Sequence, residues 1–267
     1  MTTTTVTDVL DDLLAEQAVL DRIVDLLNAE QFAAPTPSPR WTVADQLGHL
    51  TFFDTTAAMA ISEPAAFLDH KRELMSSFAD DAAVDEATLG AFRELSALDQ
   101  LSAWRHGRLD LEAAARTLAD DSRVEWYGPS MGSKSFLTAR LMEVWAHGQD
   151  IVDTVGAERP ASDRLRHIAQ LGFITRAWSY LVRGEEPPDA PVRIELQAPS
   201  GASWQWGPDD TDESVTGPAL DFCLVVTQRR HVDDTALDVQ GVLANDWMSK
   251  AQAFAGGATD GPPPRAS

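Results

Sequence analysis

The sequence contains a single cysteine, Cys223, among its 267 residues, so no disulfide bond can form within the chain. It has no run of 18 apolar residues, which is the length that a membrane-spanning helix requires. The first residues, MTTTTVTDVLDDLLAEQ, lack the basic segment and the apolar core of a secretion signal. Together these absences favour a soluble protein of the cytoplasm.

Basic residues are also scarce. The chain has 21 Lys and Arg against 42 Asp and Glu, which gives a net charge of −21. A protein this acidic repels the phosphates of DNA and RNA and the anionic headgroups of membranes, so neither is expected as a partner. Hydrophobic residues make up 44% of the chain, which is enough for a buried core, and the length suits one large domain or two smaller ones.

The first two thirds of the chain read as helical. Apolar residues recur at helical spacing between polar ones, and Thr42 followed by Asp45 predicts a capping box at the start of one helix. Gly156 suits the position just after the end of another helix. We therefore expect an up-down four-helix bundle over residues 1–185. The helices are expected at about residues 6–27, 42–61, 71–80, 86–119 (one long or two broken helices), 134–155 and 163–183.

The pattern changes after RGEEPPDAP, a proline-rich acidic linker at residues 183–191. Short segments with alternating polarity follow, together with two helical segments, so residues 186–255 are expected to form a small α+β domain. The Gly- and Pro-rich residues 256–267 are expected to be a disordered tail. The strands are expected in VRIELQAP, SWQWGP, DESVTG and ALDVQG, and the helices in PALDFCLVVTQR and VLANDWMSKAQAFAG.

The segment LMEVWAHGQD carries the most concentrated chemistry. Glu143 and His147 are four residues apart on an expected helix, so both can reach one metal ion from the same face. The spacing alone equally suits an ordinary solvated contact. His49, which lies mid-helix beside an apolar face, is the best candidate for a third ligand, and Asp150 could orient His147 from behind. Two histidines and a carboxylate are typical of catalytic zinc and of non-haem iron.

Two separated motifs resemble the mycothiol-dependent maleylpyruvate isomerase family, which belongs to the DinB-like metal-binding four-helix bundles. They are WTVAD followed by LGHL in residues 41–50, and E-x-WAHG-x-D in residues 143–150. The resemblance covers most of residues 5–185 and extends loosely into the C-terminal domain, at LVVTQRR and LDVQGVLANDW. It implies that His49, Glu143 and His147 are the ligands of a divalent metal, usually zinc.

The resemblance also implies an activity. A low-molecular-weight thiol, mycothiol, would serve as cosubstrate for isomerisation of a small molecule or for transfer of the thiol to it, because zinc makes a bound thiol a nucleophilic thiolate. Arg229 and Arg230 fall where the family has a functional arginine, which could bind a substrate carboxylate. Two arginines at a helix end also simply complement the helix dipole. The alternatives are a non-catalytic metal-binding module, a metal Lewis-acid enzyme that uses no thiol, and an iron oxygenase.

Other residues have simpler interpretations. Cys223 lies in an apolar run and is expected to be buried, and Trp145 is expected to point away from the metal and to brace its helix. His231 follows the arginine pair and could line a cleft. The loop EWYGPSMGSKS precedes the metal helix and could cover the site, and it lacks the spacing of a phosphate-binding loop.

Overall fold

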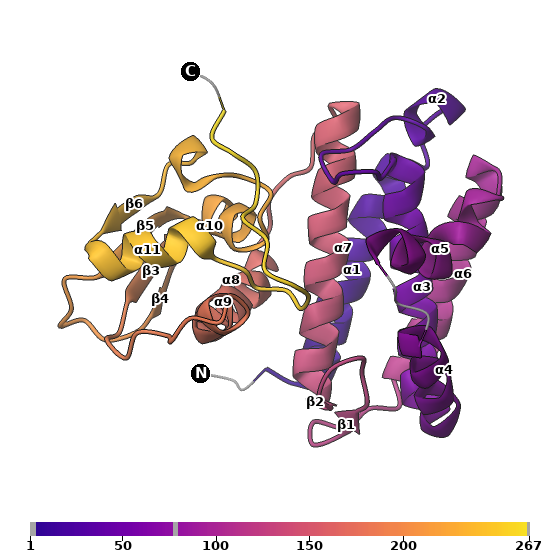
Figure 1. Cartoon of the computed structure of the whole chain (residues 1–267), viewed down its shortest axis with the longest axis horizontal. Coiled ribbons are helices and arrows are strands. Elements are labelled where there is room, and N and C mark those ends of the chain that lie inside the picture. The colour runs from indigo at the N-terminus through magenta and orange to yellow at the C-terminus, as the bar shows by residue number, and fades with distance from the viewer. Residues whose placement is uncertain (1–3, 77–79, 266–267) are drawn as a thin grey trace. The chain divides into compact units, whose positions relative to one another are not determined.

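The computed structural model describes residues 4–76 and 80–265. The chain divides into two compact units, Met1–Arg159 and Pro160–Ser267, and we describe each by itself. Within the described ranges, no helix is both long and apolar enough to cross a lipid bilayer. The expected fold class, a mainly α bundle followed by a small α+β part, is confirmed (Figure 1).

Four long helices form the bundle of the first unit (Figure 1). The helix α1 packs against α7, α7 against α3, α3 against α6, and α6 against α1, so that the four close a ring. Their inward faces carry fully buried leucines, such as Leu13, Leu47 and Leu141. Each such side chain contributes about 1.5–3 kcal/mol by leaving water. The bundle helices are α1 (Val6–Val24), α3 (Val43–Ser62), α6 (Ala97–Ala115) and α7 (Ser133–Val155).

Local sequence fixes the start of α3 and the end of α7. Oγ1 of Thr42 accepts a hydrogen bond from the backbone N–H of Asp45 at 3.2 Å, and Oδ2 of Asp45 accepts one from the N–H of Thr42 at 2.9 Å. This is the capping box that the sequence predicts. The last turn of α7 is followed by Gly156 at φ 67°, a left-handed conformation that favours glycine.

Shorter helices and one hairpin connect the bundle helices. Both α4 and α5 pack against α3. The segment expected as one or two helices over residues 86–119 is two, α5 and α6. The helix expected at residues 71–80 is the end of α4, and residues 77–79 lie outside the described part. A small hairpin lies within the segment expected as a loop. These elements are α2 (Ala29–Phe32), α4 (Pro64–Ser76), α5 (Asp81–Arg93), β1 (Arg123–Val124) and β2 (Met131–Gly132).

The second unit contains a sheet with the strand order β4-β3-β5-β6. Its strand β3 pairs antiparallel with β4 and parallel with β5, and β5 pairs antiparallel with β6. The alternation expected for a half-buried strand is present on β3, where Ile194 and Leu196 are fully buried. Apart from α8 and α9, the elements of this unit are β3 (Arg193–Gln197), β4 (Ser203–Trp206), β5 (Ser214–Pro218), α10 (Ala219–Val226), the 3₁₀ helix η1 (Val232–Asp234), β6 (Asp238–Gln240) and α11 (Val242–Lys250).

The helix expected in the bundle over residues 163–183 is divided into two, and both fall in the second unit. Within it, α8 (Leu165–Ile174) packs against α10, and α9 (Arg176–Leu181) packs against α11. Gly172 permits α8 to approach α10 closely, since a Cβ at this position would lie 2.9 Å from Cγ2 of Val226. The division therefore lies after residue 159, whereas the sequence places it near residue 185. The sequence pattern predicts that the apolar faces of α8 and α9 pack in the bundle, whereas they pack against α10 and α11 of the second unit.

The ends of this unit also differ from expectation. The single helix expected over residues 163–183 is broken at Thr175, whose Oγ1 donates to the carbonyl of Leu171 at 2.7 Å. Residues 256–265 are irregular but held in place: Oγ1 of Thr259 donates to Oε1 of Gln228 at 2.6 Å. The described part of the expected disordered tail is therefore tied to the second unit by hydrogen bonds.

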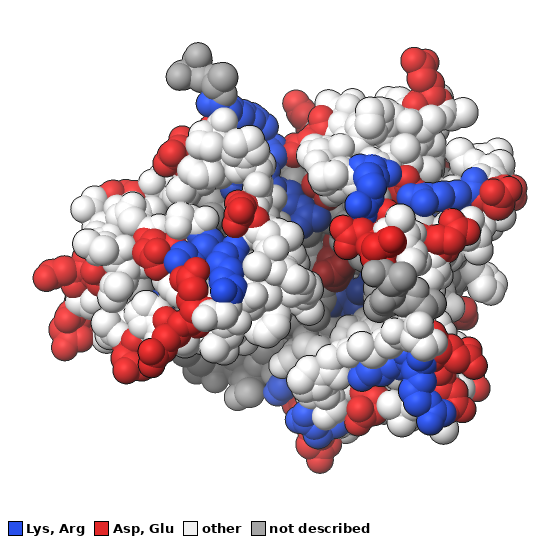
Figure 2. All heavy atoms as spheres, viewed as in Figure 1, with Lys and Arg blue, Asp and Glu red and all other residues white. Residues whose placement is uncertain are grey.

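Acidic side chains are spread over the surface of both units on the face shown in Figure 2, with basic ones between them. Arg105 illustrates the local pairing, because it donates to Asp21 and to Asp25, each at 2.7 Å. The excess negative charge is therefore distributed over this face as many small groups.

Candidate metal centre

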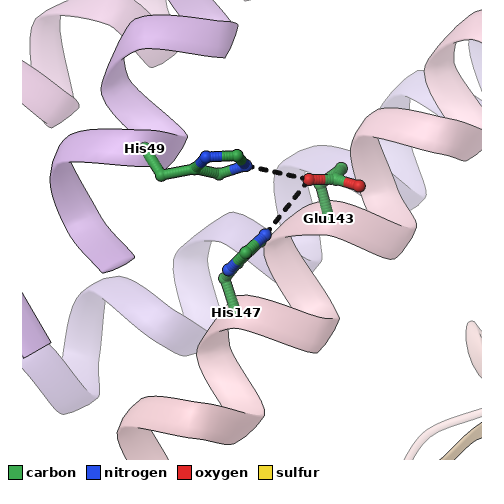
Figure 3. A group of neighbouring side chains, drawn as sticks. All are labelled: His49, Glu143 and His147. Carbon is green, nitrogen blue, oxygen red and sulfur yellow. Dashed lines mark hydrogen bonds and ion pairs between the residues drawn. The ribbon is translucent and has the colours of Figure 1, made fainter. Parts of the chain in front are cut away.

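His49, Glu143 and His147 meet between two bundle helices (Figure 3). His49 lies in the first half of α3, and the other two lie one turn apart on α7, which packs against α3. Nε2 of His49 is 3.1 Å from Oε2 of Glu143, and Nε2 of His147 is 3.2 Å from the same oxygen. The structure thus brings together the three residues that the sequence singles out as metal ligands.

The arrangement of these atoms suits a metal ion. The ligand atoms of the three residues all lie within 4.8 Å of one another. In a tetrahedral site with bonds of about 2.0–2.2 Å, neighbouring ligand atoms lie about 3.3 Å apart, close to the two separations seen here. Two imidazole nitrogens and one carboxylate oxygen are a donor set used by catalytic zinc and by non-haem iron. The three residues therefore fit a divalent metal and leave room for a further ligand.

The protonation of the site also suits a cation. Burial and the adjacent His147 lower the pKa of His49 to about 4. Burial raises the pKa of Glu143, but its hydrogen bonds with His147 and His49 outweigh burial, so that its pKa lies well below the ordinary value. At neutral pH, His49 is uncharged and Glu143 is ionised, which are the states that bind metals. The side chain of Glu143 is 25% exposed, so solvent reaches the site.

Gln46 is a residue of the site that the sequence patterns do not reveal. It is fully buried on α3, and its Oε1 lies 2.6 Å from Nδ1 of His147. Its amide nitrogen donates to Oγ1 of Thr36 at 2.9 Å. Its place one turn before His49 puts it on the same face of α3, and that spacing is the one feature that could have drawn attention to it.

Asp150 hydrogen-bonds a residue outside the three candidate ligands. Oγ of Ser38 donates to Oδ2 of Asp150 at 3.1 Å. At Nδ1 of His147 the partner is Gln46, and the expected role of Asp150 in orienting His147 stays a prediction. Asp150 therefore contacts the proline-rich segment AAPTPSPR at residues 33–40, which precedes α3. Gln46 comes from the neighbouring helix and reaches the outer edge of the imidazole directly.

Aromatic rings border the three side chains. The ring centroid of Trp41 lies 5.0 Å from that of His49 and 5.8 Å from that of His147. Phe53 lies 4.6 Å from His49 on the next turn of α3. Tyr127, in the loop between β1 and β2, makes an edge contact with Phe53 at 5.6 Å. The loop that the sequence suggests as a cover thus joins an aromatic layer beginning one turn from His49.

Residues 13–152, just over half of the chain, match the family model described as the mycothiol maleylpyruvate isomerase N-terminal domain. The chain belongs to this family. Residues 188–239 match a second model, described as wyosine base formation. An uncharacterized protein of Mycobacterium tuberculosis, present in two strains, is 42% identical over 252 residues, which cover 92% of this chain and 94% of that protein.

Solved structures of mycothiol-dependent maleylpyruvate isomerase share the fold. One crystal structure matches with a TM-score of 0.59 at 16% identity, and that of a mutant matches with a TM-score of 0.58 at 17% identity. Both matches cover 91% of this chain and 98% of the other. The resemblance stated from the two sequence motifs, to the mycothiol-dependent maleylpyruvate isomerase family, is therefore confirmed.

The two arginines that the family resemblance suggests lie in the turn after α10. Nη1 of Arg229 donates to the carbonyl of Thr227 at 2.7 Å, and Nη1 of Arg230 donates to the carbonyl of Arg229 at 2.7 Å. Gln228, at φ 59°, makes the left-handed turn that ends the helix. Both arginine side chains thus donate to backbone carbonyls in the turn that follows α10. A role in substrate binding stays a prediction.

The remaining candidates have structural partners. Cys223 is buried and donates to the carbonyl of Leu165 at 3.4 Å, and burial raises the pKa of its thiol. Nδ1 of His231 accepts a hydrogen bond from the N–H of Asp233 at the start of η1. Trp145 is buried under the guanidinium of Arg159, which lies 5.0 Å from the ring centre. Trp145 thus packs against another part of the first unit, as the bracing role requires.

Proposed function

We propose that this protein is a divalent-metal-dependent and thiol-dependent enzyme that isomerises a small molecule or transfers a thiol to it, with zinc as the metal and mycothiol as the thiol. The observation that carries the proposal is the convergence of His49, Glu143 and His147 on one point, in a chain of the mycothiol maleylpyruvate isomerase N-terminal domain family. The solved relatives, whose names state mycothiol dependence, support the choice of thiol.

Each of the three side chains has a defined part. His49 and His147 offer nitrogen lone pairs from two different helices, and Glu143 supplies a negative charge between them. Three protein ligands leave a coordination position open, which distinguishes catalytic from structural zinc sites. A zinc ion bound here would hold a thiol as thiolate at neutral pH.

The chemistry then follows from a thiolate beside a reactive carbon. Addition of the sulfur to a conjugated double bond converts that bond to a single bond, about which the substrate rotates. Expulsion of the same thiolate restores the double bond in the other geometry, with no net change in atoms or electrons. In S-transfer a leaving group departs instead. Arg229 or Arg230 would bind a substrate carboxylate through two parallel hydrogen bonds.

Metal content is the first test. Purified wild-type protein should carry about one equivalent of a divalent metal by elemental analysis. His49→Ala and His147→Ala should each abolish it. His106→Ala is the matched control, since His106 is an exposed histidine on another bundle helix, and this variant should keep the metal. A folded wild-type protein that takes up no metal would refute the proposal.

Thiol binding is the second test. Mycothiol should bind the metal-loaded protein in native mass spectrometry and should bind the metal-stripped protein much more weakly. Maleylpyruvate, the substrate named for the solved relatives, is the first substrate to assay. A metal-loaded protein that does not bind mycothiol but turns over a substrate would favour the alternative of a metal Lewis-acid enzyme that uses no thiol. A metal-loaded protein that neither binds mycothiol nor turns over a substrate would favour the non-catalytic metal-binding module.

A further inference from the structure

A continuous chain of hydrogen bonds runs outward from His147. Nδ1 of His147 faces Oε1 of Gln46 at 2.6 Å, and Nε2 of Gln46 donates to Oγ1 of Thr36 at 2.9 Å. The hydroxyl of Thr36 donates in turn to the backbone carbonyl of Trp41 at 2.9 Å. These hydrogen bonds join α7 to α3 and to the proline-rich segment at residues 33–40. Gln46, in the middle of the series, is fully buried.

The direction of this chain is set by its last member. A backbone carbonyl can only accept, so Thr36 uses its single hydroxyl proton on Trp41 and acts as an acceptor toward Gln46. The side of the Gln46 amide that faces Thr36 is therefore the NH₂ group, and the oxygen faces His147. An amide oxygen also only accepts, so the proton between Gln46 and His147 belongs to Nδ1.

We infer that Gln46 is a positioning residue for His147: it holds a proton on Nδ1 and turns Nε2 toward Glu143, so that a metal can displace the Nε2 proton and bind that nitrogen. This inference rests on the proposed metal site. A neutral imidazole has two tautomers, and only the one with an unprotonated Nε2 can bind a metal from that atom. Removing the partner of a metal-binding histidine typically costs about 10–100-fold in metal affinity.

The tautomer can be observed without any metal. In metal-free protein at pH 7, two-dimensional ¹H–¹⁵N spectra of the imidazole should show His147 protonated at Nδ1. In Gln46→Leu the fraction of His147 with a proton on Nδ1 should fall. Wild-type protein with Nδ1 of His147 unprotonated would overturn the inference, whether or not the protein binds metal.

Metal affinity gives the second measurement. Zinc titrations against a chromophoric chelator should show a loss of about 10–100-fold for Gln46→Leu. Gln46→Glu should stay within about threefold of wild type, because a carboxylate also accepts from Nδ1. The matched control is Gln100→Leu, which removes another buried glutamine of the bundle, whose amide donates to the carbonyl of Phe92, and its zinc affinity should not change.

The outcomes separate this inference from the proposed function. If Gln46→Leu binds zinc as tightly as Gln100→Leu does, Gln46 is only a packing residue and the inference fails, while the metal site stands. If wild-type protein binds no metal, the proposed function fails, and the tautomer of His147 in the spectra still decides whether Gln46 positions it.

Discussion

Asp54 on α3 and Arg140 on α7 form an ion pair inside the bundle, with Nη2 of Arg140 2.9 Å from Oδ1 of Asp54. Asp54 is fully buried, and its second oxygen accepts a hydrogen bond from the amide of Gln17 at 3.3 Å. Arg140 lies one turn before Glu143. The pair therefore joins the two helices that carry the candidate metal ligands, close to the candidate site itself.

Removal of the arginine should be costly. Arg140→Met leaves the buried carboxylate of Asp54 without its cation, and breaking a buried pair in this way costs about 3–5 kcal/mol. Urea unfolding, followed by circular dichroism, measures the loss. The double variant Arg140→Met with Asp54→Asn should lose less than the single variant, because no buried charge is left unpaired.

An exposed pair provides the control for this experiment. Arg116 pairs with Glu112 at 2.6 Å on the surface of α6, and its guanidinium is 53% exposed. Arg116→Met should change the free energy of unfolding by less than about 1 kcal/mol. If Arg140→Met also changed the free energy of unfolding by less than about 1 kcal/mol, the buried pair would not be what holds α3 to α7.

The lowered pKa of His49 predicts a dependence of stability on pH. In metal-free protein the folded state holds this pKa at about 4, while the unfolded chain has the ordinary value of 6.5. The unfolded state therefore binds the proton more readily, and the contribution of His49 is complete above pH 6.5 and is lost progressively down to pH 4. Between pH 7 and pH 5 the expected loss is about 2 kcal/mol.

Comparison with a variant isolates this contribution. Urea unfolding in the presence of a chelator at pH 7 and pH 5 should show a smaller difference for His49→Gln than for the wild type. Equal differences in the two proteins would mean that other groups account for the acid sensitivity. The same titration with zinc present should show a steeper fall, since protons then compete with the metal for His49.

The capping box at the start of α3 should contribute to stability and to the site. Thr42→Ala removes the acceptor for the N–H of Asp45 and should cost about 1 kcal/mol. Thr42→Ser keeps the hydroxyl and should cost much less. Hydrogen exchange of the first-turn amides locates the effect, and unchanged exchange in Thr42→Ala would show that the cap does not stabilise this turn.

Much of the fold could be predicted because its determinants are local. The capping box of Thr42 and Asp45, the glycine after α7 and the alternation on β3 are each contained in a few neighbouring residues. The pair Glu143 and His147 is also local, since one helical turn separates them. His49 could be added to this pair only through a second sequence motif, because it is the packing of α3 against α7 that brings His49 to Glu143 and His147.

Features that depend on tertiary contacts could not be predicted in this way. The partner of Nδ1 of His147 is Gln46, which comes from another helix and which sequence proximity does not reveal. The place of α8 and α9 in the second unit could not be predicted for a related reason. An amphipathic helix shows that one of its faces is buried, but its sequence does not state which other element covers that face.

The packing of α8 gives the last prediction. Gly172→Ala would place a Cβ 2.9 Å from Cγ2 of Val226 and 3.1 Å from Cε1 of Phe222, both on α10, and this overpacking should cost about 1–3 kcal/mol. Hydrogen exchange should become faster in α8 and α10 and stay unchanged in α1 and α7, because α8 belongs to the second unit.

Two further variants make this test specific. Val226→Ala removes the methyl groups that the new Cβ would meet, so the double variant with Gly172→Ala should lose less stability than the two single losses added together. Gly128→Ala is the control, because nothing lies within 4 Å of a Cβ at that position. Faster exchange in α1 or α7 for Gly172→Ala would instead assign α8 to the bundle, as the sequence pattern suggested.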